Sequence, residues 1–377
     1  GRLVSGPGSI TLNGDAAAEL VDVTSGALNL NGQLTGVTDL DVAADATVNL
    51  GSDERVNNAA VVTNNGGTIN LNGAEGVTTF KSTGQLGGTG TLTAGDYQLS
   101  NGASTTTGAN LGTGRLVSGP GSITLNGDAA VELVDVTSGE LNLNGQLTGV
   151  TDLTVLSGAS LMSGSADRVA DGATVNVANG GLWALGGDDT IGLLNSSGLL
   201  NGGATLSASQ YNLSNGAELA FGTNLGSGQL VSGPGSVTLN GDAAAELVDV
   251  ASGALNLNGQ LTGVTDLDVA TDATVNLGAD ERVNNAAVVT NNGGTINLNG
   301  AEGVTTFKST GQLGGTGTLT AGDYQLSNGA STAAGANLGT GRLVSGPGSV
   351  TLNGDAAAEL VDVTSGEFNL NGQLTGV

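Results

Sequence analysis

The sequence predicts an all-β protein, a right-handed parallel β-helix (β-solenoid) with about 19 residues per rung and about 20 rungs. Three observations support this fold class: a long internal repeat, a shorter period inside it, and an unusual composition. Glycine accounts for 68 of the 377 residues, and aromatic residues for only 2%, against 38% hydrophobic residues overall. The core must therefore be thin and built from Leu, Val, Ile and Ala.

The long repeat is marked by the string G-[RQ]-L-V-S-G-P-G-S-[IV]-T-L-N-G, which begins at Gly1, Gly114, Gly228 and Gly341. Successive starting positions differ by 113, 114 and 113. Because composition does not change sharply along the chain, we expect one continuous β-solenoid over residues 1–377. Its modules are residues 1–113, 114–227 (divergent), 228–340 and 341–377 (partial).

The second module departs from the first and third over about residues 152–211. One position follows the same alternation, with Ala27 and Ala254 in the first and third modules but Glu140 and Glu367 in the second module and the fragment. The array is therefore expected to alternate A, B, A, B, with a natural unit that spans 1–227.

Within a module, six segments of about 17 to 20 residues each end near a glycine-containing turn. They are residues 20–38, 39–58, 59–78, 79–97, 98–114 and 115–132. Each holds two stretches of alternating apolar and polar residues, such as Leu40/Val42 followed by Val48/Leu50, and this period of two predicts strands. A third, less regular strand or turn is expected at positions such as 33–37. Helix is a poor alternative because glycine recurs too often.

A rung of this length cannot bury its apolar face alone, so successive rungs must stack. Stacking places Leu, Val and Ile in inward ladders and pairs each strand in parallel with the rungs on either side. The strong crossover preference of parallel strands favours right-handed winding.

Corners are expected at Asn13-Gly14, Asn31-Gly32 and Asn72-Gly73, which fall at the same place in successive rungs, with Leu50-Gly51 in between. Asn and Gly tolerate positive φ, which suits a sharp corner. Stacked Asn side chains are expected to hydrogen-bond along the axis.

The net charge of −26, from 34 acidic and 8 basic residues, argues against nucleic-acid partners and against anionic membrane surfaces. The chain has no Cys, which excludes disulfides and suits an exported protein, and no His. No apolar run is long enough for a membrane-spanning helix, so we expect no membrane insertion of this segment. The chain opens at Gly1-Arg2-Leu3 without a leader, and we expect both ends to be cuts in a longer polypeptide.

Strings such as GGTINLNG, GGTGTLTAG and LGGDDTIGLLNSSG, together with the rung length, the Gly/Asn/Thr-rich acidic surface and the lack of Cys, give the chain a likeness to a known group. It resembles the long exported adhesins of Gram-negative bacteria, meaning filamentous-haemagglutinin-like exoproteins and autotransporter passenger domains. The resemblance covers the whole chain. It implies a right-handed β-helical shaft, export through an outer-membrane barrel, and roles in adhesion or biofilm.

Four acidic clusters are candidate cation sites: Asp53-Glu54-Arg55, Asp280-Glu281-Arg282, Gly186-Gly187-Asp188-Asp189 and Asn13-Gly14-Asp15. Carboxylate and backbone oxygens are the ligands that calcium prefers. The calcium-binding nonapeptide G-G-x-G-x-D-x-U-x is not met, so we expect solvated turns and assign no metal ligand, with structural calcium as the alternative.

Catalysis by paired carboxylates would need a cleft, and acids that recur once per module suit architecture better than an active site. Without His no Ser/His/Asp triad can form. The glycine-rich stretch 84–90 lacks the Lys-Ser/Thr of a phosphate loop. We therefore predict no enzyme activity, no catalytic residues and no cofactor-binding residues.

The aromatic residues recur at fixed module positions, which suggests either plugs at rung corners or platforms for glycans. They are Tyr97, Tyr211 and Tyr324 at one position and Phe80 and Phe307 at another, while Trp183 and Met162 occur only in the divergent module. A specific site is more plausible in that module. The Thr-rich strings 89–93 and 104–107 do not repeat rung after rung, so a flat Thr array is not expected.

The repeats predict a structural shaft, and the resemblance to exported adhesins implies that it belongs to a secreted bacterial cell-surface fibre or adhesin acting in adhesion, biofilm or extracellular filament formation. The expected partners are further copies of the same repeats, with host or matrix glycans as a second class. The alternatives are a calcium- or glycan-binding solenoid module and, less favoured, a polysaccharide-degrading β-helix enzyme.

Overall fold

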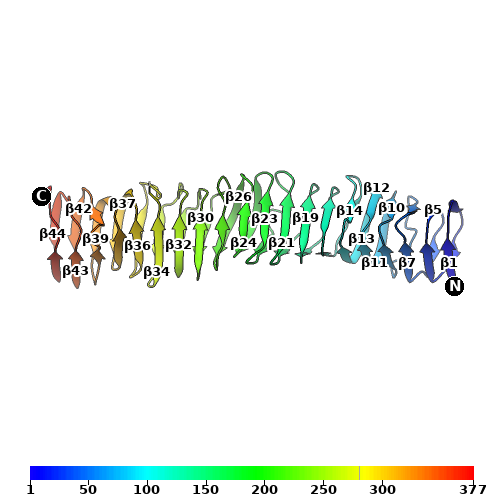
Figure 1. Cartoon of the computed structure of the whole chain (residues 1–377), viewed down its shortest axis with the longest axis horizontal. Helices are drawn as coiled ribbons and strands as arrows, with labels where there is room; N and C mark the ends of the chain where they lie inside the picture. Colours follow the sequence, from blue (N-terminus) through cyan, green and yellow to red (C-terminus); the bar gives the residue numbers. More distant parts are fainter. Residues whose placement is uncertain (280) are drawn as a thin grey trace. The chain divides into compact units, whose positions relative to one another are not determined.

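The computed structural model describes residues 1–279 and 281–377, which form an all-β parallel β-solenoid of about 19 turns with a spacing of roughly 19 residues. The described residues include no helix, and so none that could cross a membrane. They fall into two compact units, Gly1–Ile191 and Gly192–Val377, each built of stacked rungs (Figure 1). The predicted fold class is confirmed, while right-handed winding and continuity over residues 1–377 stay predictions.

The first unit has two long faces of parallel strands. The first face holds β1 (Arg2–Ser5), β4 (Leu20–Val23), β7 (Asp39–Val42), β9 (Val61–Asn64), β11 (Ala74–Ser82), β13 (Thr91–Leu99), β16 (Arg115–Ser118), β18 (Leu133–Val136), β20 (Asp152–Val155) and β22 (Thr174–Val177). The short β15 (Asn110–Leu111) pairs with the start of β13 and belongs to the third face. The second face holds β2 (Ser9–Leu12), β5 (Gly26–Leu30), β8 (Ala46–Leu50), β10 (Thr68–Leu71), β12 (Gln85–Gly88), β14 (Ser104–Thr105), β17 (Ser122–Leu125), β19 (Gly139–Leu143), β21 (Ala159–Ser163) and β23 (Leu182–Leu185).

The second unit repeats this arrangement. Its first face holds β26 (Thr205–Leu213), β29 (Gln229–Ser232), β31 (Leu247–Val250), β33 (Asp266–Val269), β35 (Val288–Asn291), β37 (Ala301–Ser309), β39 (Thr318–Leu326), β42 (Arg342–Ser345) and β44 (Leu360–Val363). The short strands β28 (Asn224–Leu225) and β41 (Asn337–Leu338) belong to the third face. Its second face holds β25 (Leu199–Asn201), β27 (Glu218–Leu219), β30 (Ser236–Leu239), β32 (Gly253–Leu257), β34 (Ala273–Leu277), β36 (Thr295–Leu298), β38 (Gln312–Gly315), β40 (Ser331–Thr332), β43 (Ser349–Leu352) and β45 (Glu367–Leu370). The residues of β24 (Asp189–Ser196) fall in both units.

The expected third, less regular strand is confirmed. Two short strands, β3 (Ala16–Ala17) and β6 (Leu34–Thr35), pair in parallel, and an isolated bridge joins Leu34 to Val56. The long strands β11 and β13 pair along almost their whole length, and the start of β13 pairs with β15. Each rung therefore has two regular faces and a third held by short contacts.

Strand register confirms six rungs per module but corrects two expected boundaries. Asp39 pairs with Val61, a step of 22 along the chain, and Thr79 pairs with Asp96, a step of 17. The rung predicted to begin at residue 59 therefore begins at 61, and the one predicted at 98 begins at 96. The alternation of apolar residues does not reveal these boundaries. A loop can be longer or shorter by a few residues while the strands on both sides of it keep their pairing.

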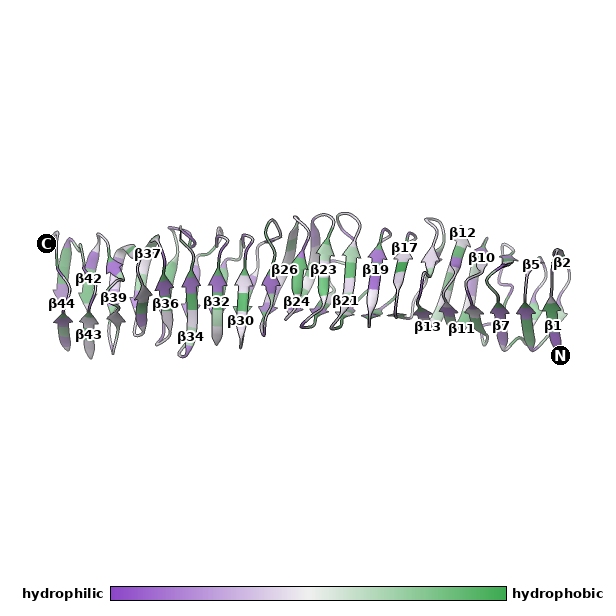
Figure 2. Ribbon diagram, in the orientation of Figure 1, coloured by the Kyte–Doolittle hydropathy of each residue, from purple (hydrophilic) through white to green (hydrophobic). Residues whose placement is uncertain are grey.

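The core consists of inward ladders formed by every second residue of each strand. On the first face Val21, Leu40, Val62, Phe80 and Tyr97 stack in register, and none is more than 4% exposed. Hydrophobic and hydrophilic stretches accordingly occur along the same strands (Figure 2). Aliphatic ladders thus provide the burial that a single rung lacks.

The predicted stacking of asparagine is confirmed, but the predicted backbone conformation of these corners is wrong. The Asn31 amide donates to Asn13 Oδ1 at 2.8 Å. Positive φ occurs instead at other glycines, such as Gly26 at +71°, and not at Gly14 or Gly32. Gly32 is required for space, since a Cβ there would lie 2.3 Å from the backbone carbonyl of Gly14.

Candidate functional site: a buried carboxylate beneath a wide loop

The widened rung of each module carries a loop between its second and third faces. We call residues 51–57, 164–170 and 278–284 the wide loops; Asp280, part of one predicted acidic cluster, lies outside the described residues. The same long step in strand register recurs in each complete module, from Asp39 to Val61, from Asp152 to Thr174 and from Asp266 to Val288. The wide loop is therefore a regular part of the module.

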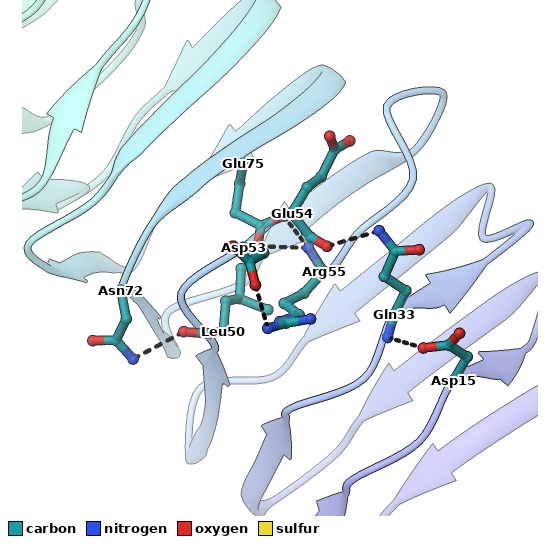
Figure 3. A network of polar contacts seen from close by, with 8 residues as sticks. All are labelled: Asp15, Gln33, Leu50, Asp53, Glu54, Arg55, Asn72 and Glu75. Atoms are coloured by element: carbon teal, nitrogen blue, oxygen red, sulfur yellow. Dashed lines mark hydrogen bonds and ion pairs between the residues drawn. The ribbon is translucent and has the colours of Figure 1, made fainter.

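A buried carboxylate from the following rung holds the first wide loop. Glu75, on β11, is 3% exposed, and its Oε1 and Oε2 accept the backbone N–H of Arg55 at 2.8 and 2.9 Å (Figure 3). Its Oε2 also accepts the N–H of Val56 at 3.0 Å. The carboxylate satisfies two backbone donors that the loop takes out of the regular ladder.

The same anchor recurs in the other two complete modules. Glu302 accepts the N–H groups of Arg282 at 2.9 Å and of Val283 at 3.2 Å. In the divergent module Asp189 takes this place, accepting the N–H of Arg168 at 3.1 Å and of Val169 at 3.3 Å. Asp189, which belongs to the predicted cluster Gly186-Gly187-Asp188-Asp189, therefore has the same role as Glu75 and Glu302.

Glu75 and Glu302 were not among the candidates from sequence, although a signal was present. Glu75 pairs with Leu92, which in turn pairs with Leu111, so the carboxylate belongs to the inward ladder of the third face. Glu75 lies two residues before Val77, so on a strand both side chains face the same side. An acidic residue on the side of a strand that faces the core was the sign of a buried carboxyl group. The six-segment alignment hid it because two rung boundaries were out of register.

Burial changes the acidity of these groups. Removal from water raises the pKa of Glu75 and of Glu302 to about 7 and that of Asp189 to about 6, against the opposing effect of the backbone N–H donors. Each carboxyl group can therefore gain or lose a proton near neutral pH.

The predicted cluster Asp53-Glu54-Arg55 lies in the loop itself. The Arg55 guanidinium pairs with Asp53 at 3.3 Å, and a Cβ at Gly51 would lie 2.7 Å from Arg55 Nε. Gly51 thus makes room for the arginine, which explains why the Asn-Gly corner is interrupted in this rung. The Glu54 carbonyl oxygen accepts the Gln33 amide at 3.1 Å.

The predicted cluster Asn13-Gly14-Asp15 acts as a cap between rungs. Asp15 Oδ1 accepts the backbone N–H of Gln33 at 2.8 Å (Figure 3). Asp128, Asp242 and Asp355 do the same for the equivalent glutamines. Among the described residues, no group of three or more His, Cys, Asp or Glu side chains could hold a metal ion. Calcium binding at these turns stays an alternative prediction.

An open pocket of about 240 Å³ lies beside the wide loop in the first module, and one of the same size in the third. Gln33, Thr35, Glu54 and Asn57 line the first pocket, whereas Glu75 does not. The carboxyl group with the raised pKa is therefore turned inward, away from the nearest cavity that could admit a ligand. This arrangement suits anchoring of the backbone.

The recurrent aromatic residues are buried plugs, which confirms the first of the two predicted roles, a plug within the rung or a platform for glycans. Tyr97, Tyr211 and Tyr324 are 0% exposed. The Tyr97 hydroxyl accepts the N–H of Ala94 at 2.9 Å and donates to the Leu92 carbonyl at 2.7 Å. Trp183 is also fully buried, with its indole N–H donated to Ser163 at 3.0 Å. None of these rings is a platform for a glycan.

The glycine-rich and Thr-rich strings also have structural roles. A Cβ at Gly84 would lie 2.3 Å from the Gly67 carbonyl oxygen, so close approach of neighbouring rungs explains that glycine. Thr105 is 3% exposed, and its hydroxyl accepts the N–H of Asn126 at 2.9 Å.

The wide loop, its buried carboxylate and its capping aspartate recur together as parts of the module's architecture. Comparison with protein-family models, with curated proteins and with solved structures finds no match to this chain.

Proposed function

We propose that this chain is the structural repeat region, or shaft, of a secreted bacterial cell-surface fibre or adhesin. The observation that supports this most directly is recurrence: strand register, wide loop and buried carboxylate repeat from module to module. A catalytic centre is usually built once, whereas a spacer benefits from identical units.

The proposed mechanism is mechanical. Each rung pairs its strands with the rungs on both sides, so adding modules extends a hydrogen-bonded stack at the inter-strand spacing of about 4.8 Å per rung. The charge of −26 opposes lateral clumping between chains. Adhesion, biofilm formation and export from a Gram-negative cell follow from the resemblance to exported adhesins and belong to the proposal.

Lengthening the chain tests the shaft. A variant with the unit 1–227 duplicated gains about 12 rungs, so negative-stain electron microscopy is expected to show particles longer by about 58 Å with unchanged width. Unchanged length, or a thicker particle, would contradict an extending shaft. Antibodies against the chain are expected to label intact producing cells, and labelling only after cell lysis would refute the surface location.

A further inference from the structure

A groove on the first face of the second unit stands apart from the architectural features. It has a volume of about 480 Å³ and lies across the ends of β35, β37, β39 and β42. Its lining includes Lys308, Gln325, Ser327, Arg342, Val344 and Pro347. It is about twice as large as three other solvent-open pockets that an arginine lines, which measure about 240, 240 and 230 Å³.

Strand pairing holds the polar side chains of the groove in place. Lys308 pairs with Gln325, and Gln325 pairs with Val344, so these three residues form one outward row across neighbouring strands. The Arg342 side chain is 48% exposed and makes two ion pairs, at 3.8 Å with Asp323 and at 3.4 Å with Asp362. Lys308 is exposed and has no ion-pair partner among the described residues.

The same outward row recurs in the first unit. Lys81 pairs with Gln98, Gln98 pairs with Val117, and Arg115 lies on the same strand as Val117. A groove of about 230 Å³ lies there, lined by Asp96, Gln98, Arg115 and Val117 but not by Lys81, and Arg115 pairs with Asp135 at 2.6 Å. The chain has only 8 basic residues against 34 acidic ones, and at both positions a lysine and an arginine lie within three successive strands.

The divergent module has the same strands without these charges. Asn195, Asn212 and Gln229 take the places of lysine, glutamine and arginine, and the Asn212 amide donates to Asn195 Oδ1 at 2.8 Å. The fold therefore does not need the basic side chains, and Lys308, unlike the ion-paired Arg342, is available to a ligand.

We infer that the Lys308–Arg342 groove, and its counterpart at Lys81 and Arg115, bind acidic saccharides, meaning sugars that carry carboxylate or sulfate groups. Lysine and arginine supply charge-assisted hydrogen bonds to such groups. Gln325 and Ser327 offer hydrogen bonds to sugar hydroxyls, while Val344 and Pro347 offer an apolar surface to a sugar ring. This inference goes beyond the proposed shaft function and does not depend on it.

The overall negative charge does not prevent this binding. At physiological ionic strength, charges farther away than about 8 Å are largely screened, whereas contacts inside the groove are not. The Asp323 and Asp362 carboxylates lie within 4 Å of Arg342, so an acidic sugar competes with them for the guanidinium. Affinity at one groove is expected to be modest and to weaken as salt is added.

The test uses the full chain and three probes: a uronic-acid oligosaccharide, a sulfated oligosaccharide and a neutral one of equal length. Titration calorimetry or NMR is expected to detect binding of at least one acidic oligosaccharide and no binding of the neutral one. The variant K81N/R115Q/K308N/R342Q carries the residues of the divergent module, so it should fold, which circular dichroism checks. Its binding is expected to be weaker by about tenfold or more.

Single substitutions provide a matched control. Arg2 occupies the same module position as Arg342 and pairs with Asp22, but it lines neither of the two grooves. R342Q is expected to weaken binding, and R2Q is expected to leave it unchanged. Preference for one acidic probe identifies the acid as carboxylate or sulfate. Equal binding of the neutral probe, no binding of either acidic probe, or undiminished binding by the folded fourfold variant overturns the inference.

Discussion

In the described part of the chain, each complete module buries one carboxyl group in a largely apolar interior, at Glu75, Asp189 and Glu302. Moving such a group out of water favours its neutral form, while backbone N–H donors favour the ionised form. The pKa values of about 7, 6 and 7 record the balance. A carboxyl group that anchors a loop thus also makes stability depend on pH.

The direction of that dependence follows from the raised pKa. In the unfolded chain these carboxyl groups titrate near their ordinary values of 4.5 for Glu and 3.8 for Asp, but in the folded chain near 7 and 6. Their contribution to the free energy of unfolding is therefore fully present below about pH 4 and is lost as pH rises through about 7. The melting temperature of the native chain is expected to fall between about pH 5 and pH 8.

The variant E75Q/D189N/E302Q is expected to flatten this dependence, because an amide does not titrate in that range. Thermal unfolding followed by circular dichroism measures the effect. The control E19Q/D39N/E246Q changes three exposed acids and should keep the native slope. Equal slopes for all three proteins would show that the buried carboxyl groups are not responsible.

A second residue-scale feature is a recurrent buried serine. The hydroxyl oxygens of Ser5, Ser118, Ser232 and Ser345 are buried and have no hydrogen-bond partner in the described part of the chain. Ser118 lies in an inward ladder between Leu99 and Val136. An unpaired hydroxyl there costs free energy without giving a bond in return.

S118A and S232A are therefore each expected to stabilise the fold by about 0.5–1 kcal/mol. Urea denaturation with an unchanged slope would measure the gain. A loss of about 1 kcal/mol or more would mean that the hydroxyl has a partner, such as a buried water, that packing alone does not reveal.

At the scale of the rung, glycine has two separate uses. Some glycines adopt positive φ, as Gly26 does, whereas the corner glycines allow neighbouring rungs to approach. A Cβ at Gly145 would lie 2.1 Å from the Gly127 carbonyl oxygen, while one at Gly172 would have no heavy atom within 4 Å. Replacing Gly145 by Ala therefore tests steric crowding between rungs, whereas replacing Gly172 by Ala tests only the change in backbone freedom.

G145A is expected to destabilise the fold by about 3 kcal/mol or more, since backbone on the neighbouring rung cannot move aside alone. G172A should change stability by less than about 1 kcal/mol. Chemical denaturation of both variants is the measurement. Similar small effects would mean that the rungs can separate locally at the corner.

At the scale of the whole molecule, negative charge dominates. Acidic side chains lie outward on neighbouring rungs, where Asp22 pairs with Asp41 and Asp249 with Asp268. Like charges opposite one another on adjacent strands are destabilising. The net charge of −26 adds repulsion over longer distances.

Salt is therefore expected to raise the melting temperature over the first few hundred millimolar, as the Debye length falls from about 10 Å toward a few ångströms. D41N/D268N should melt higher than the native chain at low salt and respond less to added salt. A melting temperature that falls with sodium chloride would indicate that ion pairs such as Arg115–Asp135, at 2.6 Å, outweigh the repulsion.

The module repeat, the parallel stacked fold and the inward ladders could all be predicted from the amino-acid sequence, because the long repeat, the rung period and the apolar alternation are properties of the chain alone. Asparagine stacking and the buried tyrosines were predictable for the same reason, since their positions recur. The register at Val61 and Asp96, the inward place of Glu75 and the basic groove at Lys308 emerged only from the folded chain. Each of these depends on which residue of one rung lies opposite which residue of the next, and loops of variable length conceal that correspondence.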